Sequence, residues 1–402
     1  MKSGCVAVLG TALAVCLPPR AAAADGLTLE AALALATERS LDILASRRRV
    51  AEAEARLRTR PALRDNPAID AARGARGASP SDFAAGLSQT FELGGRGAAR
   101  RDVDRAGLAR EEAEAVRTER DVLREVRMAF LDGLHAAERL RLARSLEADA
   151  AELERIARRR HEAGDIAALD VNVASSTRSR ARAEVKSAQA AQATALTDLR
   201  VLLGLEAGEP LSLAGPLREE RSYDAARLLA VVAERPEVRA LEAQVREAEA
   251  EVRLGKGFAW PDVTPAVRYE RDEGNRVLWT GLSVSLPLFE RGRQLRAVGR
   301  ARADGLRAEA EAMKRVLQNR VQGALASHEL RLGAVSELAA NAETLDDSEA
   351  LARRSYEVGQ IGLGELLLVR REAAEARRQW LDSLLELAQV RAELDSLAGG
   401  PR

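Results

Sequence analysis

Two very long stretches of the chain read as helices, and the first carries an apolar residue at every third or fourth position from Leu123 to Ala157. The first extends from about residue 98 to 160 and the second from about 293 to 354. Such a stripe predicts helices that pack along a narrow, coiled-coil-like seam. At 1.5 Å per residue the first helix would be roughly 90–100 Å long, too long for a compact globular domain. Each stretch is followed by a shorter helical pattern, over about 169–203 and 366–397.

A glycine separates the long and short helical patterns of each pair. The segment His161–Val171 surrounds Gly164, and the segment Tyr356–Leu366, 195 residues later, surrounds Gly359 in the same way. One offset that holds over more than a hundred residues indicates two tandem copies of one unit. We therefore divide the chain into a leader (1–24), repeat one (25–215) and repeat two (216–402). Other pairs with this offset are Leu87 and Leu282, Arg96 and Arg291, Leu199 and Leu394, and Gly204 and Gly399.

Each repeat is also expected to hold one further helix and a pair of strands. The helices are predicted over 27–60 and 223–254. Alternating apolar and polar residues predict strands over 83–93, 263–270 and 278–288, with a weaker one over 68–75. Asp272–Asn275 is a turn signal, so the two strands of repeat two read as a hairpin.

Most aromatic residues lie in or beside the predicted strands. Lipid-facing β-barrels place aromatics at the two interfaces of their apolar band, but strands also favour aromatics in general, and both explanations stay open. Four short strands cannot close a barrel, and open strand edges are not tolerated in lipid. If these strands enter a membrane, several chains must pool them.

Composition and the N-terminus narrow the class of protein. Lys plus Arg and Asp plus Glu both number 62, so the basic excess of a nucleic-acid-binding protein is lacking. Lys2, a short apolar run and Ala21–Ala24 before Asp25 predict a secretory signal peptide. The alternatives are a membrane anchor, for which the run is too short, and lipidation at Cys16, for which the preceding Val is unfavourable.

The sequence offers no catalytic or ligand-holding group. The three histidines are far apart and have no Cys or carboxylate at ligand spacing, and neither a nucleophile-elbow motif nor a phosphate-binding loop is present. We therefore predict a non-enzyme without cofactor or protein-held metal.

Taken together, these features resemble the TolC family of outer-membrane efflux channels, from about Leu27 to Gly399. The resemblance rests on the twofold repeat, on the strand pair of each repeat, and on a tip pattern of His or aromatic, two residues, Gly, five residues and an acid. Leu203-Gly204-Leu205 at the end of repeat one adds to it. The run Gln89–Arg96 is most similar to the CzcC-type branch, the outer-membrane partners of heavy-metal efflux pumps.

This resemblance implies a mainly α protein with a small β part in the bacterial outer membrane. Three chains would form one channel, with the long helices in a periplasmic α-barrel and four strands per chain in a shared transmembrane β-barrel among outer-membrane lipids. The partners would be a periplasmic adaptor and an inner-membrane pump, of RND type for this branch. The cargo would be heavy-metal cations, with drugs or secreted polypeptides as alternatives. A hypothesis of another class is a soluble periplasmic coiled-coil adaptor, without membrane insertion.

The resemblance also implies roles for residues at the tips. Asp170 and Glu365 would line the periplasmic aperture as rings of carboxylates, although acids in a first helical turn need no such role. Tyr356 and, in repeat one, His161 would brace the closed state. His161 could add pH sensitivity, although an exposed histidine at a helix end needs no such role. Leu368 stands where the family often has a further acid, which weakens the expected cation preference. Gly164, Leu169, Gly359 and Leu363 would contact the adaptor, although both glycines also fit ordinary helix ends.

Overall fold

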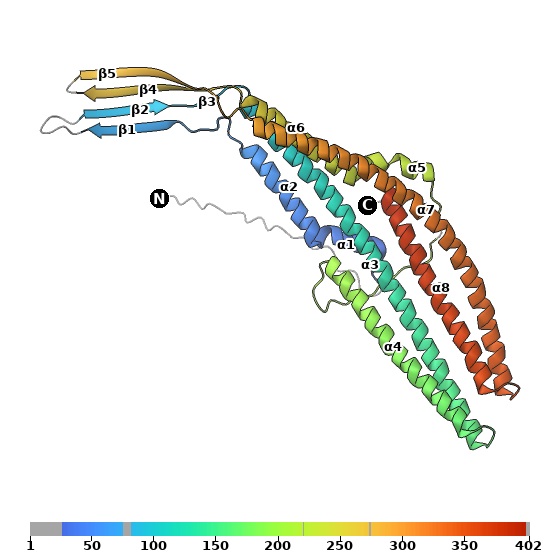
Figure 1. Cartoon of the computed structure of the whole chain (residues 1–402). Helices are drawn as coiled ribbons and strands as arrows, with labels where there is room; N and C mark the ends of the chain where they lie inside the picture. The colour runs from blue at the N-terminus through green and yellow to red at the C-terminus, as the bar shows by residue number, and fades with distance from the viewer. Residues whose placement is uncertain (1–25, 75–81, 220, 273–274, 399–402) are drawn as a thin grey trace, which may run out of the picture.

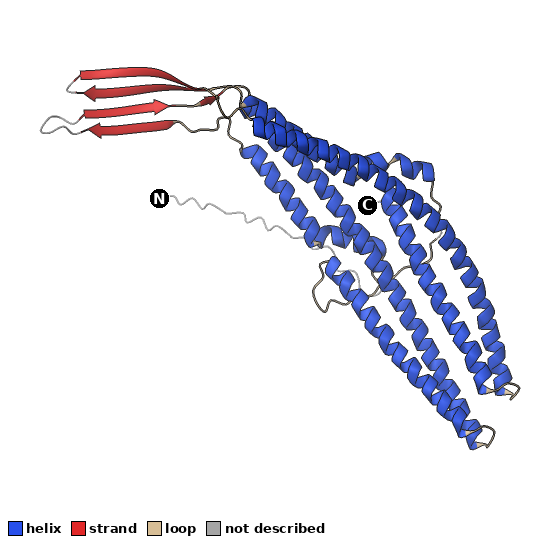
Figure 2. Ribbon diagram, viewed as in Figure 1, coloured by secondary structure: helices blue, strands red, loops and turns tan. Residues whose placement is uncertain are grey.

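The chain forms a long helical rod with a small sheet projecting from one end (Figure 1). A computed structural model describes residues 26–74, 82–219, 221–272 and 275–398. The predicted signal peptide and the tips of both strand hairpins lie outside the described residues. The sheet is drawn at one end and the two Gly-centred turns at the opposite end (Figure 2).

The long helices have nearly the predicted extents. α3 covers Arg96–Glu162 and α7 covers Arg293–Glu357, and each pairs with the helix that follows its turn, α4 (Ala168–Leu202) or α8 (Leu363–Ala398). At 67 residues, α3 is roughly 100 Å long. The apolar stripe of α3 is its packing surface, since Val126, Phe130 and Ala157 are all buried.

Each of the shorter predicted helices is interrupted. The helix predicted over 27–60 is divided into α1 (Leu29–Arg39) and α2 (Leu41–Thr59) at Ser40, whose backbone leaves the helical region. Ser40 is buried at this break, and its side chain makes no capping hydrogen bond to α2. The helix predicted over 223–254 becomes α5 (Ala225–Ala230), a 3-10 turn (Val232–Glu234) and α6 (Pro236–Gly257). Pro236 forces Arg235 into an extended conformation and then starts α6.

The cores of the two repeats are copies of each other. A cluster in repeat one joins α1, α2, α3 and α4, and its counterpart in repeat two joins α5, α6, α7 and α8. Equivalent buried residues differ by the offset found in the sequence, namely Ile43 and Val238, Val122 and Leu317, Val126 and Val321, and Leu199 and Leu394.

The strands form one antiparallel layer in the order β1 (Ala68–Gly74), β2 (Asp82–Ser88), β4 (Asp262–Asp272) and β5 (Asn275–Ser285). The strand predicted over 83–93 breaks after Ser88 and resumes as β3 (Phe91–Glu92), which also pairs with β4. The weakly predicted strand β1 is confirmed. The strand predicted over 278–288 ends at Ser285.

The strand register separates the sheet into an apolar and a polar face. Opposite residues share a face, and alternate residues along a strand do as well. One face carries Ile69, Phe83, Leu87, Val263, Val267, Tyr269, Leu278, Leu282 and Val284, whereas the other carries Asp70, Ser88, Thr264, Arg268, Glu270 and Ser283, together with Trp279. Every residue of β5 is exposed in the single chain, so the apolar side chains of this single-layered sheet are not covered by other elements.

Candidate functional site: the hairpin tips

The two tips use the same backbone design. In the first, the amide of Asp165 donates to the carbonyl of Arg160 at 2.8 Å, and in the second the amide of Gln360 donates to the carbonyl of Ser355, also at 2.8 Å. This bond closes a helix when the preceding residue adopts a positive φ. Gly164 and Gly359 have φ values of 83° and 78°. The space around both glycines is open, so their conformation and not their size is what the turn requires.

Tyr356 and His161 occupy equivalent positions but different surroundings. Tyr356 is 2% exposed and packs with Leu363 and Leu366 of its own hairpin against residues of α3 and α4. His161 is exposed, and its Nδ1 donates to the carbonyl of Ile166 at 2.9 Å across the first turn. Tyr356 therefore joins the two hairpins, whereas His161 stabilises one tip.

Arg160, from the opposite hairpin, contacts both the backbone and the ring of Tyr356. Its guanidinium donates to the Tyr356 carbonyl at 3.0 Å and lies 5.0 Å from the centre of the tyrosine ring. Burial raises the pKa of Tyr356, the charge of Arg160 opposes this shift, and the charge of Asp170 adds to it. The phenol is therefore neutral at physiological pH. Arg160 could not be singled out from the sequence, because nothing in its Arg-rich surroundings indicates which arginine faces the other repeat.

The remaining predicted tip residues differ in exposure. Leu169 is 70% exposed, and Glu365 lies on the surface, whereas Asp170 is half-buried. Leu363 is buried beside Tyr356, so in the single chain its side chain does not form part of the outer surface of the tip. The structure thus brings Asp170, Tyr356 and Leu363 to the contact between hairpins and leaves Gly164, Leu169 and Gly359 at the end of the rod.

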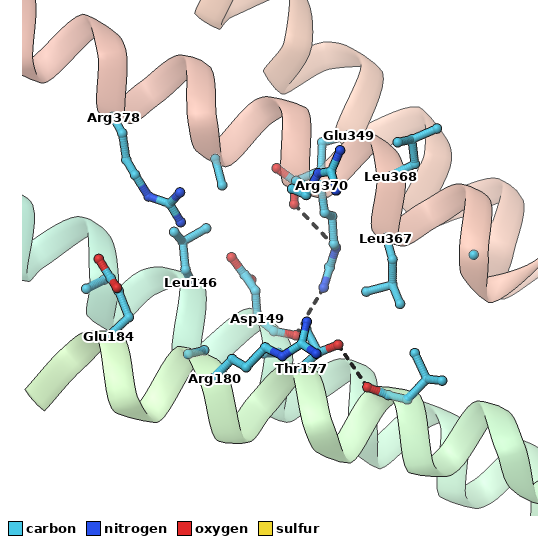
Figure 3. A pocket seen from close by; sticks show the side chains of 17 residues that line it. Leu146, Asp149, Thr177, Arg180, Glu184, Glu349, Leu367, Leu368, Arg370 and Arg378 are labelled. Atoms are coloured by element: carbon cyan, nitrogen blue, oxygen red, sulfur yellow. Dashed lines mark hydrogen bonds and ion pairs between the residues drawn. The ribbon is translucent and has the colours of Figure 1, made fainter. Parts of the chain in front are cut away.

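Behind the tips, a cavity of about 570 Å³ opens between the two hairpins (Figure 3). Its wall contains a polar bridge from α8 to both neighbouring helices. Arg370 donates to the carbonyl of Asp149 on α3 at 3.2 Å, and its Nε lies 3.4 Å from Glu349 on α7. Glu349 also pairs with Arg377 at 3.1 Å. Burial lowers the pKa of Arg370, and the charge of Glu349 opposes that shift. This bridge therefore joins the two hairpins at a second point, in addition to the contact at Tyr356.

The described residues contain no group of three or more His, Cys, Asp and Glu side chains placed to hold a metal ion. No helix in the same part of the chain is both long and apolar enough to cross a membrane.

A family model described as "Outer membrane efflux protein" matches the chain twice, over residues 32–205 and 229–400. The chain belongs to the outer membrane efflux protein family. The family match and the fold together confirm the resemblance to TolC-type channels, the two repeats and the prediction that the protein transports and does not catalyse. The chain is an outer-membrane efflux channel with a large periplasmic helical part, and the soluble-adaptor hypothesis is wrong.

Individual relatives of this efflux channel are similar over most of its length. The cobalt-zinc-cadmium resistance protein CzcC of Cupriavidus metallidurans is 27% identical, over 97% of this chain and 94% of its own. The pyoverdine export outer membrane protein OpmQ of Pseudomonas aeruginosa is 26% identical, over 77% of this chain and 65% of its own. A solved structure of CusC superposes with a TM-score of 0.78 at 17% identity, over 93% of this chain and 92% of that one.

Proposed function

We propose that this efflux channel is the exit duct of a tripartite system that expels heavy-metal cations. Three copies form the channel, and a periplasmic adaptor and an inner-membrane pump of RND type deliver the cargo. Channels of this family form trimers that act with adaptor and pump partners. The observation that carries the choice of cargo is the similarity, over nearly both whole chains, to a cobalt-zinc-cadmium resistance protein. The run Gln89–Arg96 points in the same direction.

The tips supply the proposed aperture and the proposed docking surface. In a trimer, Asp170 and Glu365 each form a ring of three carboxylates that attracts cations at the constriction. Tyr356, held by Arg160, and His161 brace the tips in the closed arrangement. Gly164, Leu169 and Gly359 meet the adaptor at the end of the rod, and Leu363 supports this surface from behind.

The test is metal tolerance in a bacterial strain that lacks its own channels of this family. The strain receives this chain together with the adaptor and pump of a cobalt-zinc-cadmium efflux system. We expect several-fold higher tolerance to these three cations and a lower cellular metal content. Unchanged tolerance, despite trimers in the outer membrane, would show that heavy metals are not the cargo.

Export of a small organic molecule is the second candidate, because OpmQ is similar over three quarters of this chain. Pairing the channel with the adaptor and pump of a pyoverdine export system tests it in the same strain. Siderophore in the medium without metal tolerance would favour this candidate.

Neutralising both rings with Asp170→Asn and Glu365→Gln should lower the cation selectivity of purified channels in planar bilayers if the carboxylates line the aperture.

A further inference from the structure

The apolar face of the sheet ends in a row of arginines. Arg73 of β1 lies opposite Phe83 of β2, which in turn lies opposite Arg271 of β4. Arg271 lies opposite Arg276 of β5. Opposite residues share a face of an antiparallel sheet, and Arg271 follows Tyr269 of the apolar face by two residues, so the row belongs to that face. It is the outermost row of this face within the described strands, and we call Arg73, Arg271 and Arg276 the arginine row.

Charge is distributed differently on the two faces of the sheet. Within the described strands, the positions of the apolar face include no acidic residue, and their only arginines are those of the arginine row. The polar face carries both signs, as in Asp70, Arg268 and Glu270. All three side chains of the arginine row are exposed in the single chain. The apolar face therefore presents positive charge alone, and only at one end.

This end of the sheet points away from the rod (Figure 1). Because the helical part is periplasmic, the arginine row lies towards the outer surface of the membrane. Arg271 is eight residues beyond Val263 in β4, which corresponds to about 20 Å across the membrane for a strand tilted by about 40°. The apolar band of a membrane β-barrel is about 25 Å tall and is bordered by aromatic residues, which Tyr269 and Phe83 supply here. An extended arginine side chain at this level reaches the headgroup layer.

An anion at the arginine row relieves two unfavourable features of the single chain. Arg271 and Arg276 are directly opposite each other, and like charges in such a pair repel. An arginine that faces lipid is also costly unless its guanidinium reaches the membrane surface. Guanidinium groups bind phosphate through two parallel hydrogen bonds, which favours arginine wherever this group is recognised. The row therefore has the charge, the geometry and the depth to bind phosphate at the membrane surface.

We propose that the arginine row binds the phosphate groups of lipid headgroups in the outer leaflet of the outer membrane. Arg271 and Arg276 hold one phosphate between them, and Arg73, two strands away, contacts a neighbouring one. Phe83, between Arg73 and Arg271, packs against the apolar part of the same lipids. The site fixes the depth at which the sheet lies in the membrane. It goes beyond the proposed function, because it involves neither the cargo nor the adaptor and pump.

Binding of lipid A, a phosphorylated glycolipid, to the full-length channel tests the site. The detergent-solubilised protein is titrated with lipid A, and bound lipid is counted by native mass spectrometry. We expect Arg73→Gln, Arg271→Gln and Arg276→Gln each to lower the affinity about fivefold, the usual contribution of one basic residue at an anionic membrane surface. The triple variant should bind lipid A no better than lipid A without its phosphates. Unchanged affinity in the triple variant would overturn the inference.

A matched control variant comes from the other face of the same strand. Arg268 lies three residues before Arg271 in β4, but on the polar face. Arg268→Gln should therefore leave the affinity for lipid A unchanged. A loss as large as that of Arg271→Gln would contradict the assignment of the site to the apolar face.

Two further measurements need no variant. The native protein should bind lipid A without its phosphates at least about tenfold more weakly than intact lipid A. Inorganic phosphate at the same concentration should not displace bound lipid A, because the site lies where the headgroup and its acyl chains bind together. Equal affinity for the two lipids, or displacement by inorganic phosphate, would overturn the assignment to a lipid headgroup.

These measurements require no metal, adaptor or pump, so they separate the lipid site from the proposed function. A channel that binds lipid A as expected without raising metal tolerance would refute only the proposed cargo. A channel that raises metal tolerance, but whose affinity for lipid A does not depend on the arginine row, would refute only this inference.

Discussion

Tyr356 shows how one side chain can hold two repeats together. Its ring fills a cluster between the hairpins, and the guanidinium of Arg160 covers that ring from the other repeat. Its hydroxyl makes no hydrogen bond within the described part of the chain. The stabilisation therefore comes from the buried ring and not from the polar atom.

Substitution can separate these two contributions. Tyr356→Phe should leave the tips almost unchanged, whereas Tyr356→Ala should cost about 3–5 kcal/mol of local stability because it leaves a cavity. Hydrogen exchange of the residues around the two turns measures this difference. Equal protection from exchange in the Ala variant and the native protein would mean that contacts other than Tyr356 hold the two hairpins together.

Glu154 makes the pairing of α3 with α4 sensitive to acid. It is buried, and hydrogen bonds from Arg158 at 2.6 Å and Arg178 of α4 at 2.9 Å hold its pKa at about 2, below the usual 4.5. A lowered pKa in the folded state contributes stability that is complete above the unfolded value. This stability is lost as the pH falls from about 4.5 towards 2.

Glu154→Gln should remove this part of the acid sensitivity. At pH 7 the variant should melt at a lower temperature than the native protein. This difference between the two melting temperatures should become smaller as the pH falls from about 4.5 towards 2. Thermal unfolding followed by circular dichroism at several pH values measures it. A gap that stays constant across this range would show that the charge of Glu154 does not stabilise the hairpin.

At the scale of elements, the tip turns depend on backbone conformation. Gly359 adopts a φ of 78°, which a β-branched residue adopts only with strain, and an added side chain would meet only the end of Arg160. Gly362, three residues later, lies in equally open space but has no positive φ. The two glycines therefore separate the effect of conformation from that of size.

We expect Gly359→Val to abolish export while trimers remain in the outer membrane, because the strain is confined to the turn. Gly359→Asn should retain export, since Asn tolerates positive φ, and Gly362→Val should also retain it. Export and trimer content are measured in the same cells. Normal export by Gly359→Val would mean that the shape of the tip has no role.

Individual elements also show which features of the structure can be predicted from the periodicity of the sequence. The seam of α3 and the glycine turns were predictable, because each depends on residues close together in the chain. The division at Ser40 was not, because one serine in a helical pattern is usually tolerated. The burial of Leu363 and the role of Arg160 could not be predicted either, because both depend on how one hairpin faces the other. Ile69 lies opposite Leu87 and Pro265 lies opposite Leu282, so β1 and β4 correspond at an offset of 196 and not 195. This difference appears only when the strand partners are known.

At the scale of the whole molecule, the exposed sheet explains why the chain needs both a membrane and further copies of itself. One of its faces is apolar and the other is polar, and neither is covered by helices. We expect the apolar face to meet lipid in the outer membrane and the polar face to line the channel. Leu282 and Ser283 are neighbours in β5 that lie on these two faces, and both are exposed in the single chain.

Arginine at each of these positions should have opposite consequences. On the lipid face, Leu282→Arg should destabilise the inserted channel by about 2–4 kcal/mol if it lies near the middle of the membrane. Ser283→Arg should leave insertion intact and lower the conductance for cations, because its charge enters the channel. The two variants are compared by the yield of heat-modifiable trimers in outer-membrane fractions and by bilayer conductance. Poor insertion of Ser283→Arg with normal insertion of Leu282→Arg would reverse the two faces. In that case the polar residues of the sheet would have to lie against lipid, where their unpaired groups would have no partners.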